Sequence, residues 1–247
     1  VSDCRLRAMQ DYMDVKVVLA ETEIFTVQQQ GLIERPGDYG RDFLTRILPA
    51  VMFQSADFVA ATREHRRMLH EMTPIYEQFD ILLMPSFGAA KPITAHRPIS
   101  FWKGANAQVL ANITAGPALA MTCGFSANGM PMGLQLVGAP LDDARVLGVG
   151  HVLEGALGLR AARPKLTAGQ AAPTLTAPDL TPDTSHCDAL TRDFATHMAR
   201  NAGLRLSDDL LEVLFEAAPY ALEMSRRLQK KRDWFDEPAN NFRPGAR

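Results

Sequence analysis

Apolar residues form two kinds of pattern along this chain, a helical spacing and short continuous runs. At about residues 6–27 apolar positions recur at helical spacing, with Met9, Met13 and Val17 on one face, which predicts an amphipathic helix. A breaker-rich loop is expected at 31–40. The same helical spacing predicts further helices beginning near residue 42 and spanning about 55–79, 142–157, 187–202 and 207–231.

Short apolar runs between these helices predict strands. The runs cover about residues 80–85, 119–124 and 132–137, and each has the length and flanking breakers of a buried strand. The turn from Ser126 to Gly129 contains Asn-Gly, which favours a hairpin between the last two runs. Interleaved strands and helices predict a layered α/β fold.

A change of composition separates the last third of the chain. Prolines at 164, 173, 178 and 182 lie in a stretch rich in Thr, Ala and Asp, which predicts an extended linker. We therefore divide the chain into an α/β region at 1–166, a linker at 167–185 and a helical region at 186–247.

Bulk composition excludes some classes of function. Among 247 residues, 47% are hydrophobic, 22% are charged and the formal net charge is −2, so nucleic acid and anionic membranes are not expected as partners. No apolar run approaches the roughly 18 residues of a spanning helix. Three distant cysteines are expected to be free thiols in a reducing, cytoplasmic compartment. The first residue is Val1, which processing or truncation would explain.

One segment carries most of the functional information. It reads Asn112-Ile-Thr-Ala-Gly-Pro-Ala118, continues through Cys123-Gly-Phe125 and ends in Gly129-Met-Pro-Met-Gly-Leu-Gln135. This order resembles the C-terminal signature of the amidase signature family, and 55–63, 79–86 and 143–154 resemble further family segments. The resemblance implies the C-terminal half of a truncated amidase, with a mixed sheet and flanking helices.

The residues of the signature are expected to build a wall beside a catalytic centre. Glycine and proline suit a tight turn and a close approach of backbone. Two departures put the backbone path in doubt, since the family's Thr-Gly pair is Thr114-Ala115 here and its proline before Cys123 is Thr122. The structural signature residues are Asn112, Thr114, Gly116, Pro117, Gly124, Gly129, Pro131, Gly133 and Gln135.

The catalytic residues of the resembled family cannot be placed in this chain. The family uses a lysine base and two serines in a Gly/Ser-rich segment, whereas this sequence has neither adjacent serines nor Gly-Gly. We therefore assign no catalytic residue and expect this chain alone to be inactive. The resemblance implies hydrolysis of an amide or urea-like C–N bond by a serine in an N-terminal half, supplied in cis or in trans, without metal or organic cofactor.

Arg46 is the candidate for binding substrate. Thr45-Arg46-Ile47 resembles the place where some relatives pair an arginine with a substrate carboxylate, and the guanidinium fork suits that role. A surface or interdomain salt bridge is the alternative. The stretch from Lys103 to Ala107 lacks the acid with which glutamine-using relatives hold an ammonium group, which argues against a glutaminase.

Other reactive side chains have simpler interpretations. Cys123 is expected to be a buried strand thiol, and Ser126 lies in a hairpin, not in a nucleophile elbow. His65, His70 and His151 lack the spacing of metal ligands, so no metal site is expected. Phe101 and Trp102 could line a pocket, although core packing is the simpler interpretation.

The region 186–247 resembles the small helical partner subunit of some amidases. Its ending, Glu237-Pro-Ala-Asn-Asn-Phe-Arg-Pro244, resembles a tail that wraps the amidase as a belt, here fused into one chain. An unrelated helical hairpin is the alternative. The basic residues at 226–232 are interpreted as a solvated helix end.

Two rival functions remain at the level of sequence. The chain could be a subunit of a tRNA-dependent amidotransferase, against which the missing acid and the lack of a basic face argue. It could also be a non-catalytic scaffold or binding module. A small-molecule amide, carboxylate-bearing or not, is the expected partner, and a homo-oligomer is left open.

Overall fold

The structure is a computed structural model that describes residues 2–163, 167–171 and 174–228. The strands are β1 (Leu82–Ala89), β2 (Ala118–Phe125) and β3 (Pro131–Val137). The helices are α1 (Met9–Glu34), α2 (Arg41–Ile47), α3 (Ser55–Gln78), α4 (Ser100–Lys103), α5 (Val109–Thr114), α6 (Asp143–Leu157), α7 (Ala189–Asn201) and α8 (Asp208–Leu228). The expected α/β class is confirmed.

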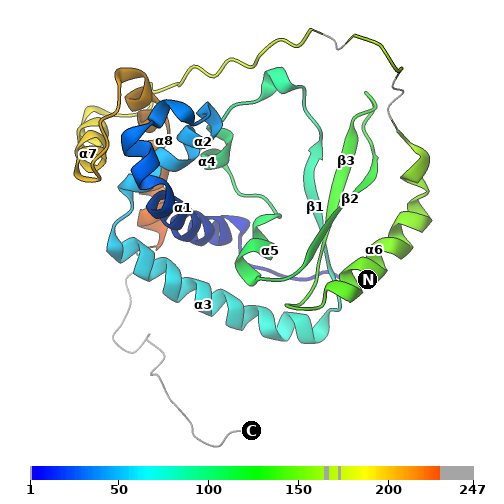
Figure 1. Ribbon diagram of the computed structural model, residues 1–247. Helices are drawn as coiled ribbons and strands as arrows, with labels where there is room; N and C mark the ends of the chain where they lie inside the picture. The colour runs from blue at the N-terminus through cyan, green and yellow to red at the C-terminus, as the bar shows by residue number, and fades with distance from the viewer. Residues whose placement is uncertain (1, 164–166, 172–173, 229–247) are drawn as a thin grey trace, which may run out of the picture.

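The elements gather into two parts (Figure 1). Helices α1 to α5, α7 and α8 form what we call the helical side, and the three strands with α6 form the sheet side. Helix α3 runs beneath both parts, and the extended residues 174–188 pass over the opposite edge to reach α7. No single helix of the described residues is long and apolar enough to cross a membrane, although the bent pair Arg41–Met52 and Ser55–Gln78 passes that test by length and composition.

The sheet has the order β1-β3-β2, and both pairings are antiparallel. The expected hairpin joins β2 to β3, and so short a turn permits only antiparallel pairing. The sheet described here is therefore antiparallel, where the family resemblance implied a mixed one. Because β3 is central, β1 and β2 are the edges of the described sheet.

Two elements are longer than their sequence patterns predicted. Helix α1 continues through Gly31, expected in a loop, to Glu34. The Tyr39 hydroxyl lies where a Cβ on Gly31 would stand, so glycine is used there for close packing. Strand β1 continues through Pro85, which is tolerated because an edge strand does not need every backbone donor.

The main core lies on the helical side and includes helices from both ends of the chain. Val15 of α1, Met68 of α3 and Leu214 of α8 are fully buried in one cluster. A smaller cluster of Leu134, Leu136 and Val146 packs α6 on one face of the sheet. Helix α8 is thus part of the main core, while the domain boundaries expected at 166 and 186 stay a prediction.

Candidate functional site

The turn of the signature follows α5 directly. Helix α5 ends at Thr114, and Ala115 adopts the left-handed conformation with φ 53° and ψ 26°. Glycine reaches this region at little cost, whereas a residue with a Cβ is strained there. The departure from Thr-Gly to Thr-Ala therefore leaves the left-handed turn in place and adds strain to it.

Gly116 brings this turn against the end of β3. A Cβ on Gly116 would overlap the carbonyl oxygen of Gly138, so the close approach of backbone expected from the sequence is present. The buried Thr114 hydroxyl donates to the Leu110 carbonyl oxygen at 2.9 Å and accepts a hydrogen bond from the Tyr76 hydroxyl at 3.1 Å. Helix α3 thereby holds the turn, and burial raises the pKa of Tyr76, so its hydroxyl stays protonated as the donor.

The signature also shapes the sheet face that looks away from α6. A Cβ on Gly133 would crowd Ser86 of β1, whose hydroxyl accepts a hydrogen bond from Gln108 Nε2 at 3.1 Å. Gln135, one pleat further along β3, is 7% exposed, and its Oε1 has no hydrogen-bond partner in the part of the chain that the structure describes. A buried acceptor without a hydrogen bond costs free energy. The described residues around this face therefore do not supply all the hydrogen bonds that its polar groups need.

The remaining signature residues have scaffold positions. Gly129 has φ 78° in the turn between β2 and β3, where a positive φ is required. Pro131 begins β3, and Gly124 lies in β2 beside a register shift. Asn112 is exposed on α5, and Pro117 follows the left-handed turn.

Arg46 is bound by a carboxylate of the same chain. Its Nε and Nη2 each donate to a different oxygen of Glu21 at 2.8 Å, and Glu21 is fully buried. Lys16 Nζ also lies 3.1 Å from Glu21 Oε1. This geometry corresponds to the salt-bridge alternative, while binding of a substrate carboxylate by Arg46 stays a prediction.

An aromatic ring lies beneath these two cations. Arg46 Cζ is 4.8 Å and Lys16 Nζ is 5.0 Å from the centroid of the Phe101 ring. Burial lowers the pKa of Lys16 more than the nearby Glu21 raises it. Trp102 is buried and donates from Nε1 to the Thr45 carbonyl oxygen at 3.0 Å, so it is core, whereas Phe101 supports the ion pair.

The other reactive side chains have local partners. Cys123 Sγ contacts the Met132 carbonyl oxygen at 3.5 Å, and Ser126 donates to Met130 O at 3.1 Å within the turn. His65 Nε2 lies 2.7 Å from the Ile113 carbonyl oxygen, which ties α3 to α5. His151 is exposed on α6. In the described ranges no group of three His, Cys, Asp or Glu could hold a metal ion.

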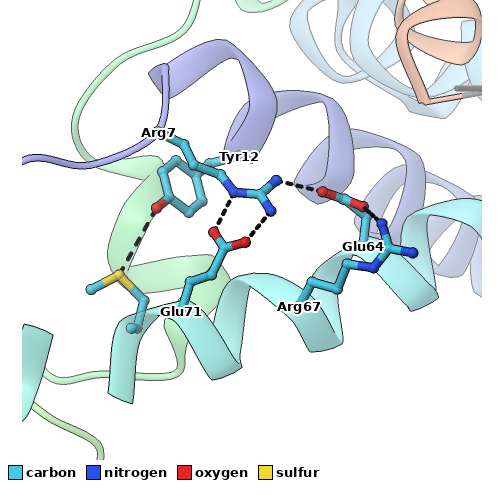
Figure 2. A network of polar contacts seen from close by, with 6 residues as sticks. Arg7, Tyr12, Glu64, Arg67 and Glu71 are labelled. Atoms are coloured by element: carbon cyan, nitrogen blue, oxygen red, sulfur yellow. Dashed lines mark hydrogen bonds and ion pairs between the residues drawn. The ribbon is translucent and has the colours of Figure 1, made fainter. Parts of the chain in front are cut away.

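A further polar network fastens the start of the chain to α3 (Figure 2). The Arg7 guanidinium donates two hydrogen bonds to Glu71 and one to Glu64. Arg67 Nη1 donates to the other oxygen of Glu64 at 3.3 Å. These contacts bind the segment before α1 to α3, the helix that also carries Tyr76.

Comparison with known proteins identifies the central part of the chain. The amidase family model matches residues 32–147. This segment belongs to the amidase family. It includes Arg46, the signature turn and all three strands.

Curated relatives agree with that assignment. A glutamyl-tRNA(Gln) amidotransferase subunit from Synechococcus sp. (strain CC9902) is 31% identical over 139 residues, covering 53% of this chain and 28% of the relative. Fatty acid amide hydrolase of Medicago truncatula is 30% identical over 123 residues, covering 45% and 20%. The matched part of the chain thus spans between about a fifth and just over a quarter of the length of these relatives.

Solved amidase structures are similar at low identity. A crystal structure of an amidase matches with a TM-score of 0.47 and 21% identity, covering 60% of this chain and 36% of that one. The 6-aminohexanoate cyclic dimer hydrolase in complex with its substrate matches with a TM-score of 0.46 and 22% identity, covering 65% and 37%.

Sequence reasoning missed two features of this amidase segment. Glu21 as the partner of Arg46 lies one helix earlier in the chain, and nothing in a linear pattern couples them. The helical spacing of α1 gave only a weak signal. A glutamate on the buried face of that helix requires a cation, but the spacing does not say which one. The cavity above the sheet, described below, depends on the path of residues 88–100, which carries no periodic pattern.

Proposed function

We propose that this chain is the C-terminal part of an amidase-signature hydrolase that cleaves an amide or urea-like C–N bond. The observation that carries the proposal is the signature turn, in which Thr114, Ala115 and Gly116 pack against the end of β3 inside the amidase segment. A serine nucleophile and a lysine base come from an N-terminal half, in cis or in trans.

In this mechanism an activated serine attacks the carbonyl carbon, ammonia or an amine leaves, and water frees the acyl group. The residues described here form the wall beside that chemistry. The signature turn fixes the backbone next to the sheet, and the face carrying Gln135 supplies a buried acceptor that lacks a donor in the described chain. No metal or organic cofactor enters the proposal.

The substrate of the proposed hydrolase is a small amide, and Arg46 is a candidate for binding a carboxylate on it. Arg46 keeps 37% of its side chain exposed, yet Glu21 already occupies Nε and Nη2. In the intact enzyme Arg46→Ala should raise KM mainly for substrates with a carboxylate. An equal rise for neutral amides would remove that role and leave the Glu21 ion pair as its whole function.

The first test is the intact mass and activity of the protein as its source cell makes it. The 247 residues weigh 27.1 kDa. We expect a catalytic half, in the same chain or copurified, and ammonia release from simple amides that a serine-directed reagent abolishes. A protein of 27.1 kDa without partner and without hydrolysis would instead support the scaffold.

A subunit of a tRNA-dependent amidotransferase is the second candidate, favoured by the relatives that carry that name. The stretch from Lys103 to Ala107 contains no acid to hold a substrate ammonium, which favours the hydrolase. Ammonia release from a small amide in the absence of tRNA and of any second subunit would exclude the amidotransferase.

The helical appendage at 186–247 is proposed to act as a partner subunit fused in cis. Helices α7 and α8 pack on the helical side, and Ser225 of α8 donates to Asp57 of α3 at 2.6 Å. The expected belt at 237–244 lies outside the described residues. The three cysteines are free thiols, in keeping with the proposed cytoplasmic location.

A further inference from the structure

A cavity of about 910 Å³ lies between the sheet and the segment that follows β1. In Figure 1 this segment arches away from the sheet before it reaches α4. One wall is the sheet face that looks away from α6, including Ser86, Thr122 and Gly133, and the other is the arch, here defined as residues 88–100. The volume suits a small molecule.

The basic side chains of the cavity all come from the arch. Lys91, His96 and Arg97 line it, and among the described residues no acidic side chain does. Arg97 Nη1 donates to the carbonyl oxygens of Thr94 at 3.1 Å and His96 at 2.7 Å, which fixes the direction of the guanidinium. Toward the residues that the structure describes, Nε and Nη2 donate no hydrogen bond, which leaves them for a ligand.

Lys91 and Arg97 are the permanently charged residues of the cavity. They differ from Arg46 because no carboxylate of the described residues is bound to them. Within the described ranges neither Lys91 nor Arg97 forms an ion pair, whereas Arg46 holds Glu21 with both arms of its fork. His96 is engaged by Asp42, whose Oδ1 lies 2.6 Å from its Nε2. Asp179 of the extended stretch acts on Arg97 only through space and is fully exposed.

We infer that the cavity binds a small carboxylate, with Arg97 as its ion-pairing residue and Lys91 as a second cation. The body of the ligand lies along the sheet wall, where Ala120, Gly133 and Met132 offer apolar surface beside the Thr122 hydroxyl. That this ligand is the carboxylate end of the amide substrate rests on the proposed function, and Arg97 then takes the place considered above for Arg46, whose fork is held by Glu21. Binding of the carboxylate itself does not.

The test compares a charged and a neutral probe of nearly the same shape, succinamate and succinamide, by calorimetry on the full chain. Arg97→Ala should weaken succinamate binding about tenfold, as loss of a hydrogen-bonded charge pair implies, and leave succinamide unchanged. Lys91→Ala should weaken succinamate by about threefold. Arg160→Ala, an exposed arginine outside the cavity lining, is the matched control and should change neither.

Asp179→Asn should change the affinity for succinamate in the opposite direction to Arg97→Ala. Removing the nearby carboxylate should tighten succinamate binding about twofold at low salt and less at high salt. Equal loss for both probes in Arg97→Ala, no binding of succinamate by the native chain, or loss in Arg46→Ala instead of Arg97→Ala would each overturn the inference.

Failure of the proposed function is a separate result. Tight, Arg97-dependent binding of succinamate by a protein that hydrolyses no amide in any assembly would keep the carboxylate site and remove the hydrolase. Hydrolysis of neutral and carboxylate amides with the same KM, unaffected by Arg97→Ala, would keep the hydrolase and remove the site.

Discussion

The helical side and the sheet side treat their buried polar groups differently. On the helical side, Asp14, Glu21 and Asp57 are buried, and each has a partner, in Arg227, Arg46 and Ser225 respectively. On the sheet side, Gln135 Oε1 is buried without a partner among the described residues. Satisfied networks make a region rigid, whereas unsatisfied groups mark a missing contact.

Exposed apolar side chains occur on both sides, for example Val27 of α1 at 77% and Leu190 of α7 at 79% on the helical side. Leu83 of β1 is 61% exposed, and Leu147 and Val152 of α6 are 61% and 70% exposed. Both edges of the described sheet, β1 and β2, have one unpaired flank. Open strand edges beside exposed apolar groups favour protein contacts, so the strand edges, and not the amount of exposed apolar surface, distinguish the sheet side.

The largest effect should come from comparing one leucine on each side. Leu214→Ala empties a fully buried site on α8 and should lower the free energy of unfolding by about 3 kcal/mol. Leu147→Ala on α6 should change it by less than about 0.5 kcal/mol, because an exposed side chain leaves no cavity. Urea denaturation followed by circular dichroism measures both.

The same pair tests the division of the molecule. If Leu147→Ala destabilises the chain as much as Leu214→Ala, the outer face of α6 is covered in solution and the sheet side is not open. A smaller exposed apolar patch should also reduce self-association, so Leu147→Ala should shift the sedimentation profile toward the monomer, while Leu214→Ala should not.

The sequence predicted the sheet side well because its information is local. Three short apolar runs and an Asn-Gly turn predict β1, β2, β3 and the hairpin without any distant contact. The ends of the elements were less well predicted. Whether α1 continues through Gly31 depends on the contact with Tyr39, which lies beyond the end of the helix and packs back against it.

The partners on the helical side could not be predicted from the sequence. Arg46 pairs with Glu21 and Arg227 pairs with Asp14, across 25 and 213 positions of the chain. The sequence indicates that a buried acid needs a cation but not which one. The arch has no periodic sequence pattern, so the grouping of Lys91 with Arg97 needed the structure.

Two neighbouring substitutions test the junction between the helical side and the sheet side. One should destabilise the chain and the other should stabilise it. Gly116→Ala forces a Cβ against the Gly138 carbonyl oxygen and should cost about 2 kcal/mol. Ala115→Gly relieves a left-handed residue and should stabilise the chain by about 0.5 kcal/mol, the strain removed less the chain entropy added. Thermal unfolding of the two single variants checks both signs.

Hydrogen exchange shows where the junction acts. Gly116→Ala should loosen the amides of β3 and leave those of α1 protected, because the helical side has its own core. Destabilisation by Ala115→Gly would mean that the turn is not left-handed in solution.

The smallest effect should come from the surface network around Arg7 and Glu71. Breaking it tests whether the apolar core or the ion pairs stabilise the helical side. Hydrogen bonds from Arg7 lower the pKa of Glu71. A carboxyl with a lowered pKa in the folded state binds fewer protons than in the unfolded chain, so its contribution is full above about pH 4.3 and disappears as the pH falls through the folded value.

Glu71→Gln should therefore cost about 0.5 kcal/mol at pH 7, a value kept low because Glu71 is partly exposed. Its unfolding free energy should approach that of the native chain as the pH falls through the lowered pKa of Glu71. Urea denaturation of both proteins from pH 7 to pH 3 measures this difference, with the exposed Glu77→Gln of α3 as control. A loss as large as that of Leu214→Ala would show that the helical side is held by charge at its surface, and the contrast with the sheet side would then depend on salt.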